Sequence, residues 1–287
     1  MKRITSIILA ALTLFSVLAL ASCSKGSSSN TAKATVSTTS GDTLKSGVLT
    51  IGIDNTYPPM EYVDPDSGDN VGFDIDMSKE IGKRLGKTVN FVPTQWDGIF
   101  QALNTDKFDA IISSVSMSED RMQNFAFTKP YIANAQMIIV KKGDKSIKTP
   151  SDLKGKTVGC QLGTTANDSA TYLQDTEGVK FTLKTYDSEM DTFSDMKAGR
   201  LQAIIVDEVV GQYYIKTDSK NFQSASVNLT NEPMGACFKK SNTVLRDEVQ
   251  KAIDDMVSDG TMKKISVKWF GKDMTSNIDD KLKSIGQ

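Results

Sequence analysis

Two stretches of the chain repeat the same order of strand and helix patterns, and this repetition constrains the fold more than any other feature. Short apolar runs rich in β-branched residues, typical of strands, alternate with segments of helical periodicity. Strands that alternate with helices build a largely parallel sheet, so the sequence predicts an α/β protein with two such units. The main predicted strands are 48–53, 89–92 and 108–113 in the first unit, and 157–162, 181–186 and 201–206 in the second.

The first helix of this pattern illustrates the periodicity. Met77, Ile81 and Leu85 recur at four-residue steps and should share one buried face. Asp74 is placed to cap the start of the helix, and Gly86 is placed to end it.

Polar residues follow one buried strand in each unit. Residues 113–116 (Ser-Ser-Val-Ser) end the strand 108–113, and Asp207 ends the strand 201–206. Open α/β sheets bind ligands just beyond the carboxyl ends of their strands. We therefore expect these two ends to face each other across a ligand-binding cleft.

The N-terminus carries an export pattern. A cationic start at residues 1–3 precedes an almost wholly apolar run, 4–21, and small residues then lead to Cys23. We interpret 1–22 as a lipoprotein signal peptide, and 23–43 as a lipidated cysteine with a flexible tether poor in apolar residues. This predicts attachment to the extracytoplasmic face of the cell membrane. An uncleaved membrane anchor with an incidental cysteine is the alternative.

Composition excludes several classes of function. The chain has no histidine, which removes Ser-His and Cys-His nucleophilic pairs and histidine-based zinc sites. Its net charge is −1, or −3 once Lys2 and Arg3 are removed with the signal peptide, so no nucleic-acid partner is expected. No phosphate loop or dinucleotide fingerprint occurs, and we expect neither a cofactor nor a metal.

Beyond Cys23, Cys160 and Cys237 are the remaining cysteines, each within an apolar, strand-like run. Export permits a disulfide between them. Two separately buried thiols are the preferred interpretation.

Several motifs occur in the order found in one protein family. They are Ile51 to Pro59 (IGIDNTYPP), Gly72 to Asp76 (GFDID), Ser113 to Arg121 (SSVSMSEDR), Gly199 to Ala203 (GRLQA) and the segment from Asp259 to Gly271. Together they resemble the polar amino-acid solute-binding proteins, the receptors of ABC importers, over about residues 48–272. The resemblance implies the two-lobed periplasmic-binding-protein (type II) fold. In this fold each lobe is a central mixed sheet flanked by helices, and two crossing strands join the lobes.

The resemblance also implies the boundaries of the lobes. Residues 44–135 plus 233–287 would form lobe 1, and residues 136–232 would form lobe 2. Hinges are expected near 133–136 and 230–233, and the lobes would close on a ligand by hinge motion.

By the same resemblance, Arg121 binds the carboxylate of an amino acid, because a guanidinium donates two parallel hydrogen bonds. The local alternative is a surface arginine paired with Glu119 or Asp120. Ser114 and Ser116 resemble first-lobe partners of the ligand, through a carbonyl and a hydroxyl respectively.

Three second-lobe residues complete this grip. Thr164 and Thr165 resemble second-lobe donors to the same carboxylate, at a helix N-terminus that attracts anions; read locally, Thr165 is a helix cap. Asp207 resembles the acceptor of the ligand ammonium, and its alternative role is to cap the helix that begins at Glu208.

The side chain of the ligand has its own predicted partners. Tyr57 and Trp96 lie where the family sandwiches it between aromatic rings, which suit a cation; the alternative for Trp96 is plain core. Asp54, helped by Ser113, matches the position that binds a distal polar group.

Signals for specificity conflict. The run 113–116 is similar to that of basic amino-acid receptors, and the run 94–97 is similar to that of cystine receptors. Gln161, also expected at the ligand, stands where the glutamine receptor has a lysine, and Ala166 stands where some basic receptors have a glutamine. A basic amino acid or glutamine is the favoured ligand, with cystine as a further candidate.

The predicted function is therefore capture of a free polar L-amino acid and its delivery to the transmembrane subunits and ATPase of an ABC permease. We expect a monomer tethered through Cys23 and no enzymatic activity. Two alternatives stay open: an enzyme like the periplasmic cyclohexadienyl dehydratase, which shares this fold, and an amino-acid sensor for a signalling partner.

Overall fold

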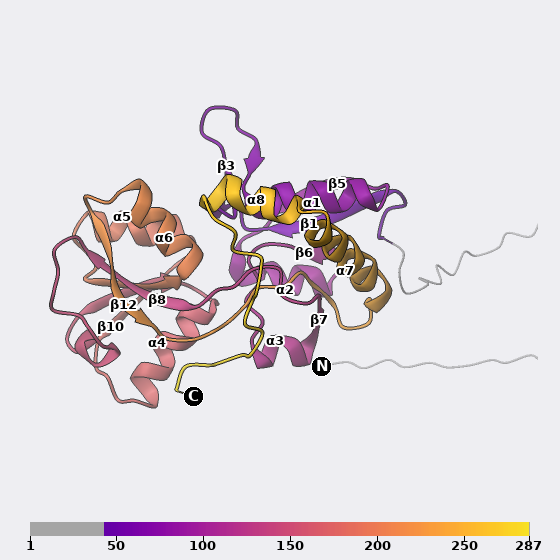
Figure 1. Ribbon diagram of the computed structural model, residues 1–287. Helices are drawn as coiled ribbons and strands as arrows, with labels where there is room; N and C mark the ends of the chain where they lie inside the picture. Colours follow the sequence, from indigo (N-terminus) through magenta and orange to yellow (C-terminus); the bar gives the residue numbers. More distant parts are fainter. Residues whose placement is uncertain (1–42, 287) are drawn as a thin grey trace, which may run out of the picture. The chain divides into compact units, whose positions relative to one another are not determined.

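The computed structural model describes residues 43–286, in which two five-stranded sheets are each flanked by helices (Figure 1). The predicted signal peptide 1–22, Cys23 and the tether up to residue 42 lie outside the described residues. Within residues 43–286, no helix combines the length and apolar character that crossing a bilayer requires.

The first sheet combines four strands from the first half of the chain with one that follows the second sheet: β1 (Val48–Ile53), β5 (Thr88–Pro93), β6 (Ala110–Ile111), β7 (Phe125–Phe127) and β13 (Cys237–Lys239). Their order is β5-β1-β6-β13-β7. β1 pairs in parallel with β5 and β6, whereas β13 runs antiparallel to β6 and β7. A small antiparallel sheet, β2 (Thr56–Tyr57), β3 (Glu61–Val63) and β4 (Asn70–Val71), lies between β1 and the first helix in sequence.

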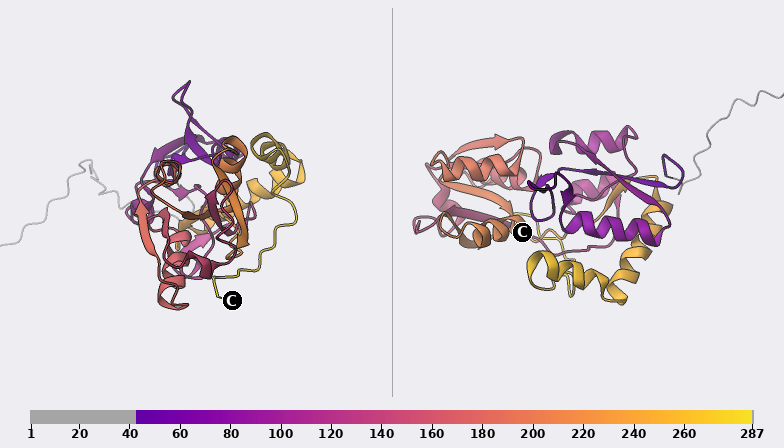
Figure 2. Two further views of the ribbon diagram at one scale, coloured as in Figure 1. Left: turned by 90° about the vertical axis from the view of Figure 1, so that its left-hand side faces the viewer. Right: turned by 90° about the horizontal axis from the view of Figure 1, so that it is seen from above.

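Five helices belong to this part of the protein: α1 (Phe73–Arg84), α2 (Trp96–Asn104), α3 (Glu119–Asn124), α7 (Thr243–Ser258) and α8 (Thr261–Phe270). The last two return from the far end of the sequence and pack beside α1 (Figure 2).

All strands of the second sheet come from one continuous segment: β8 (Gln136–Lys141), β9 (Thr157–Gln161), β10 (Thr182–Tyr186), β11 (Ala203–Asp207) and β12 (Phe222–Asn228). Their order is β10-β9-β11-β8-β12, with β9 parallel to β10 and β11 and with β8 antiparallel to β11 and β12. Each predicted unit is thus a sheet with a parallel part and antiparallel additions. The flanking helices are η1 (Pro150–Leu153), α4 (Thr165–Asp175), α5 (Glu189–Lys197) and α6 (Glu208–Thr217).

The chain passes between the sheets through two extended segments, 128–135 and 229–236. They are short segments joined at isolated positions rather than long continuous strands: Ile132 pairs with Met234, and Glu232 N–H donates to the Asn134 carbonyl at 2.9 Å. The C-terminal tail lies against the second crossing segment, because the backbones of Lys283 and Asn231 exchange two hydrogen bonds of 2.8 and 3.0 Å. Beyond it, Ile285 packs against the core of the second sheet.

Cys160 lies in β9 and Cys237 lies in β13, in different sheets, and both are fully buried and free. The interpretation as two separate thiols is confirmed. Neither forms the disulfide that export would permit.

The start of α1 differs from the prediction. Gly72, not Asp74, is the residue before the first helical position, and Asp74 lies fully buried inside the first turn. Gly72 has φ of 138°, a conformation that favours glycine, and a Cβ there would lie 2.1 Å from the backbone oxygen of Met60. Only glycine lets the chain enter α1 so close to Met60, and this entry carries Asp74 into the interior.

Replacing Gly72 with alanine should lower the free energy of unfolding by about 2–4 kcal/mol, because the new Cβ combines backbone strain with a steric clash. Urea unfolding of the purified protein measures this. Gly98→Ala is the matched control: Gly98 lies inside α2, and a Cβ at this position would have no other group within 4 Å, so the substitution should gain about 0.5–1 kcal/mol. Equal effects of both changes would contradict the explanation.

Candidate ligand-binding site

Arg121 projects from α3 into the interior, and its side chain is almost fully buried. Its Nη1 donates to the Ser116 carbonyl at 3.1 Å and its Nη2 donates to the Gly163 carbonyl at 3.4 Å. The guanidinium carbon lies 5.3 Å from the centre of the Trp96 ring and 5.0 Å from that of Phe100. Within residues 43–286 it forms no ion pair, so the alternative of pairing with neighbouring acids of α3 is wrong.

Burial is the main influence on this guanidinium and lowers the pKa of Arg121, while more distant carboxylates such as Asp168 oppose the shift. Arginine nevertheless keeps its charge in proteins. A buried cation whose protein partners are neutral carbonyls and rings has capacity left for an anion.

The N-terminus of α4 lies beside Arg121. Thr164 is the residue that caps it, since its hydroxyl accepts from the Asn167 N–H at 3.2 Å; the local reading of Thr165 as the cap is wrong by one position. The Thr165 hydroxyl instead accepts from the Gln136 amide at 3.0 Å. The first turn of α4 adds partial positive charge to the same end of the site.

Asp207 ends β11, and its side chain makes no cap hydrogen bond to α6. One of its oxygens accepts from the amides of Asn134 and Gln136, both at 2.6 Å, and the other accepts from the Tyr57 hydroxyl. Burial raises the pKa of Asp207, and these hydrogen bonds, led by that from Tyr57, oppose the rise. The carboxylate of Asp207 therefore faces the cavity, where it can accept a hydrogen bond from an ammonium group.

Asp54 follows β1 at another part of the site. Its carboxylate accepts from the Thr56 hydroxyl at 2.7 Å and from the Gln161 amide at 2.6 Å, and its own N–H donates to the Ser113 hydroxyl at 2.9 Å. Burial raises the pKa of Asp54. Gln161 lies behind Asp54, where it also donates to the Asp187 carbonyl.

Glu61 is a site residue that sequence reasoning missed. It lies in β3 with 1% of its surface exposed, and it accepts from the Ser113 hydroxyl at 2.7 Å. The sequence analysis assigned no role to the segment directly after Pro59, and the available signal was the position of Glu61 between Met60 and Tyr62. An acid in an apolar setting of this kind is worth testing as a buried carboxylate.

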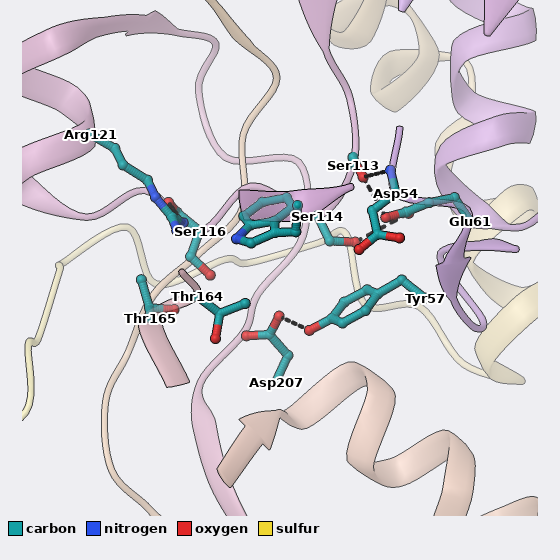
Figure 3. A pocket seen from close by; sticks show the side chains of 11 residues that line it. Asp54, Tyr57, Glu61, Ser113, Ser114, Ser116, Arg121, Thr164, Thr165 and Asp207 are labelled. Atoms are coloured by element: carbon teal, nitrogen blue, oxygen red, sulfur yellow. Dashed lines mark hydrogen bonds between the residues drawn. The ribbon is translucent and has the colours of Figure 1, made fainter. Parts of the chain in front are cut away.

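These residues line one cavity (Figure 3). Every predicted ligand residue lines it except Gln161, and Glu61 is added. Trp96 is therefore a cavity wall as well as core. The lining is Asp54, Tyr57, Glu61, Trp96, Ser113, Ser114, Ser116, Arg121, Thr164, Thr165 and Asp207. No group of three or more Cys, Asp or Glu residues within 43–286 is arranged to hold a metal ion.

Hydrogen bonds between residues near the first sheet and residues near the second sheet close this cavity. Tyr57 reaches Asp207, and the Trp96 indole N–H donates to the Gly163 carbonyl at 2.9 Å. The Asp54–Gln161 contact is a third link between the two halves. The described protein is thus in a closed arrangement.

Residues 49–272 match the model of the bacterial extracellular solute-binding proteins, family 3. The chain belongs to this family. The L-cystine-binding protein TcyJ of Escherichia coli strain K12 is 34% identical over 230 residues, which cover 80% of this chain and 85% of TcyJ.

Solved structures of amino-acid-binding proteins agree with the fold. An ancestral arginine-binding protein bound to arginine has a TM-score of 0.73 at 36% identity, covering 78% of this chain and 99% of that one. The ancestral amino acid-binding protein AncCDT-1, a precursor of cyclohexadienyl dehydratase, has a TM-score of 0.72 at 36% identity, covering 78% and 96%. These likenesses confirm the two-lobed fold predicted from the sequence.

Buried carboxyls in and around the site predict a pH-dependent stability for the protein. Burial is the main cause that raises the pKa of each of Asp54, Glu61, Asp74, Glu189, Asp207 and Glu232. The unfolded chain loses these protons near pH 4, whereas the folded protein retains them to higher pH. The folded state therefore becomes less stable as the pH rises through these raised pKa values.

The melting temperature of the ligand-free protein should accordingly fall between about pH 5 and pH 8. Thermal unfolding in a series of buffers at constant ionic strength checks this. Asp195→Asn is the control, because Arg200 lowers the pKa of Asp195 to about 2 and this group is ionised throughout the range. A melting temperature that rises from pH 5 to pH 8 would contradict the assignment.

Proposed function

We propose that this family member is the lipid-anchored, extracytoplasmic receptor of an ABC importer, which captures a polar L-amino acid and delivers it to the permease. The observation that carries the proposal is that Arg121 and Asp207 both line one cavity. Within residues 43–286, neither of them forms an ion pair. A guanidinium at one place and a carboxylate at another complement the two charges of a free amino acid.

The carboxylate of the ligand would bind the free donors of Arg121 and the N-terminus of α4 at Thr164 and Thr165. Ser114, through its carbonyl, and Ser116, through its hydroxyl, would bind the ligand ammonium from the first-lobe side. The ammonium would take the place of the Tyr57 hydroxyl at Asp207, so that a charged donor replaces a neutral one.

Asp54 and Glu61 favour a basic amino acid. Both carboxyls line the cavity, and Tyr57 and Trp96 add aromatic rings to its wall. Rings and carboxylates both attract a cation. Glutamine, whose amide can donate to these oxygens, is the second choice, and cystine is a further candidate.

Closure would use the two crossing segments. We propose lobe 1 as 44–135 plus 233–287, lobe 2 as 136–232, and hinges within the two crossings. Asn134 and Gln136 support this, since both lie at the first crossing and both donate to Asp207. Binding of the ligand ammonium would thus act directly on side chains of the hinge.

A panel of amino acids in a thermal-shift assay should identify the ligand. At a thousandfold excess over Kd a ligand stabilises the folded state by about 4 kcal/mol, and each kcal/mol raises the melting temperature by roughly 2–4 °C in a protein of this size. Arg121→Ala should abolish the shift because the carboxylate loses its charged partner. Arg121→Lys, which keeps the charge without the planar fork, should reduce it.

Arg200→Ala is the matched control, because Arg200 is an exposed arginine paired with Asp195, and its loss should leave the shift intact. A normal shift in Arg121→Ala would refute the carboxylate assignment. Incubation with arogenate or prephenate separates the enzymatic alternative, which requires turnover rather than binding.

Anchoring has a separate test. Cys23→Ser removes the thiol that would carry the lipid, so the protein should leave the membrane fraction and lose labelling by a fatty-acid analogue. Cys160→Ser is the control, because this thiol is buried in β9 and should not affect fractionation. Unchanged membrane retention of the Cys23 variant would favour an uncleaved anchor.

A further inference from the structure

Two buried carboxyl groups lie together beside the side-chain region of the cavity. Glu61 in β3 lines the cavity, and Asp74 in α1 lies behind it with no exposed surface. The Ser114 hydroxyl lies 3.4 Å from an oxygen of each. The pair is thus part of one hydrogen-bonded cluster rather than two separate groups.

Within residues 43–286, one carboxylate oxygen of Asp74 accepts no hydrogen bond. Asp74 Oδ2 accepts from the Ser114 N–H at 2.7 Å and from the Tyr131 hydroxyl at 3.0 Å. Ser114 adopts a φ of 51°, uncommon outside glycine, in the conformation that makes this bond. Asp74 Oδ1 is buried and has no donor within the described residues. A proton on Glu61 would supply that donor.

Within residues 43–286, none of the groups that face the pair carries a positive charge. Asp54 faces Glu61 from the end of β1, Tyr57 faces it from β2, and Ser113 faces it from the end of β6. Around Asp74 the neighbours are Tyr131 from the crossing and Ser114. From the second lobe, Gln161 and Glu189 face Asp54. Among the described residues, Arg121 is the one cation that lines the cavity, and it lies away from Glu61 (Figure 3).

Two adjacent carboxylates buried without a cation cannot both stay ionised at low cost. Burial and repulsion from Asp74 raise the pKa of Glu61 well above its ordinary value, and burial also raises the pKa of Asp74. One retained proton, held between them, satisfies both the charge and the unpartnered oxygen.

We propose that Glu61 and Asp74 share one proton in the ligand-free protein, and that the cationic side chain of a bound basic amino acid displaces it. This inference rests on the proposed function and adds the residue that selects the class of ligand. The proton passes to solvent while the ligand keeps its own charge. One positive charge thus replaces another, so the net charge of the site does not change.

A ligand with a neutral side chain cannot make this exchange. It leaves the shared proton in place and gains no ion pair, so it binds more weakly than its cationic counterpart. L-Arginine and L-citrulline are a suitable pair, because they differ mainly in replacement of the guanidinium by a neutral urea group.

Isothermal titration calorimetry in phosphate and in Tris, buffers of different ionisation enthalpy, counts the protons released on binding. At pH 7 arginine should release about one proton more than citrulline, and its affinity should rise by up to tenfold per pH unit in the range where release occurs. L-Lysine serves as a second cationic probe, and L-glutamine serves as a second neutral one.

Glu61→Gln should remove the extra proton release and weaken arginine binding at least tenfold. Asp74→Asn, which removes the other half of the pair, should also remove the release. Glu232→Gln is the matched control: it is a buried acid with a raised pKa near Asp207, outside the cavity lining, and it should keep the difference between arginine and citrulline.

Equal proton release for arginine and citrulline, or unchanged release in both Glu61→Gln and Asp74→Asn, would overturn the shared proton while leaving the receptor function intact. Tight binding of glutamine or cystine, with no binding of arginine or lysine, would overturn the cationic exchange. Failure of all amino acids to bind would instead remove the proposed function on which the inference rests.

Discussion

The rest of the site is organised around a buried guanidinium that forms no ion pair with a carboxylate in the part of the chain that the structure describes. Arg121 is held by two backbone carbonyls and two aromatic rings, and the N-terminus of α4 points at the same place. The guanidinium and the helix end both concentrate positive potential in a region with little water. An anion bound here would offset the cost of burying this charge, so the proposed ligand would favour the closed arrangement.

The hydrogen-bond donors that reach Asp207 in the closed arrangement are neutral groups. The Tyr57 hydroxyl occupies one oxygen of Asp207, while Asn134 and Gln136 occupy the other. A phenol offers less to a buried carboxylate than an ammonium does. Under the proposed function, the same side chains would close more strongly on an amino acid than on themselves, so a ligand would shift the equilibrium toward the closed arrangement.

The parts of the fold with strong periodicity could be predicted from the sequence, because β-branched runs and four-residue apolar steps reflect burial directly. The strand ends that carry Ser113 to Ser116 and Asp207 followed from the same pattern. The start of α1 was mispredicted, because an aspartate near a helix start normally caps it, whereas the close approach of Gly72 to Met60 turns Asp74 inward. Gly72 and Met60 are close in space but are not neighbours in the sequence.

The sequence analysis did not predict Glu61, and the reason is related. Its role depends on Ser113 and Asp74, which come from other elements, so no local pattern contains it. Motif resemblance supplied most of the cavity wall because it carries positions over one by one. It also placed Gln161 at the ligand, although the side chain of Gln161 lies behind Asp54. The order of motifs along the chain predicts which positions lie at a cleft. It is a poorer guide to which atoms face the interior of that cleft.

The charges of the cavity wall bear on the choice between cystine and a basic amino acid. The far end of a bound cystine would carry both an ammonium and a carboxylate, so a fitted site needs a cation beside its acids. Around Asp54 and Glu61 the lining residues offer hydroxyls and rings, and Arg121, the one lining cation within residues 43–286, is proposed to bind the other end of the ligand. A second carboxylate placed there would meet two acids in a low-dielectric setting, which costs several kcal/mol unless a proton intervenes. A guanidinium or ammonium meets the same acids with attraction. Identity of 34% to a cystine-binding relative is compatible with either ligand, and the charge balance of the wall favours the basic one.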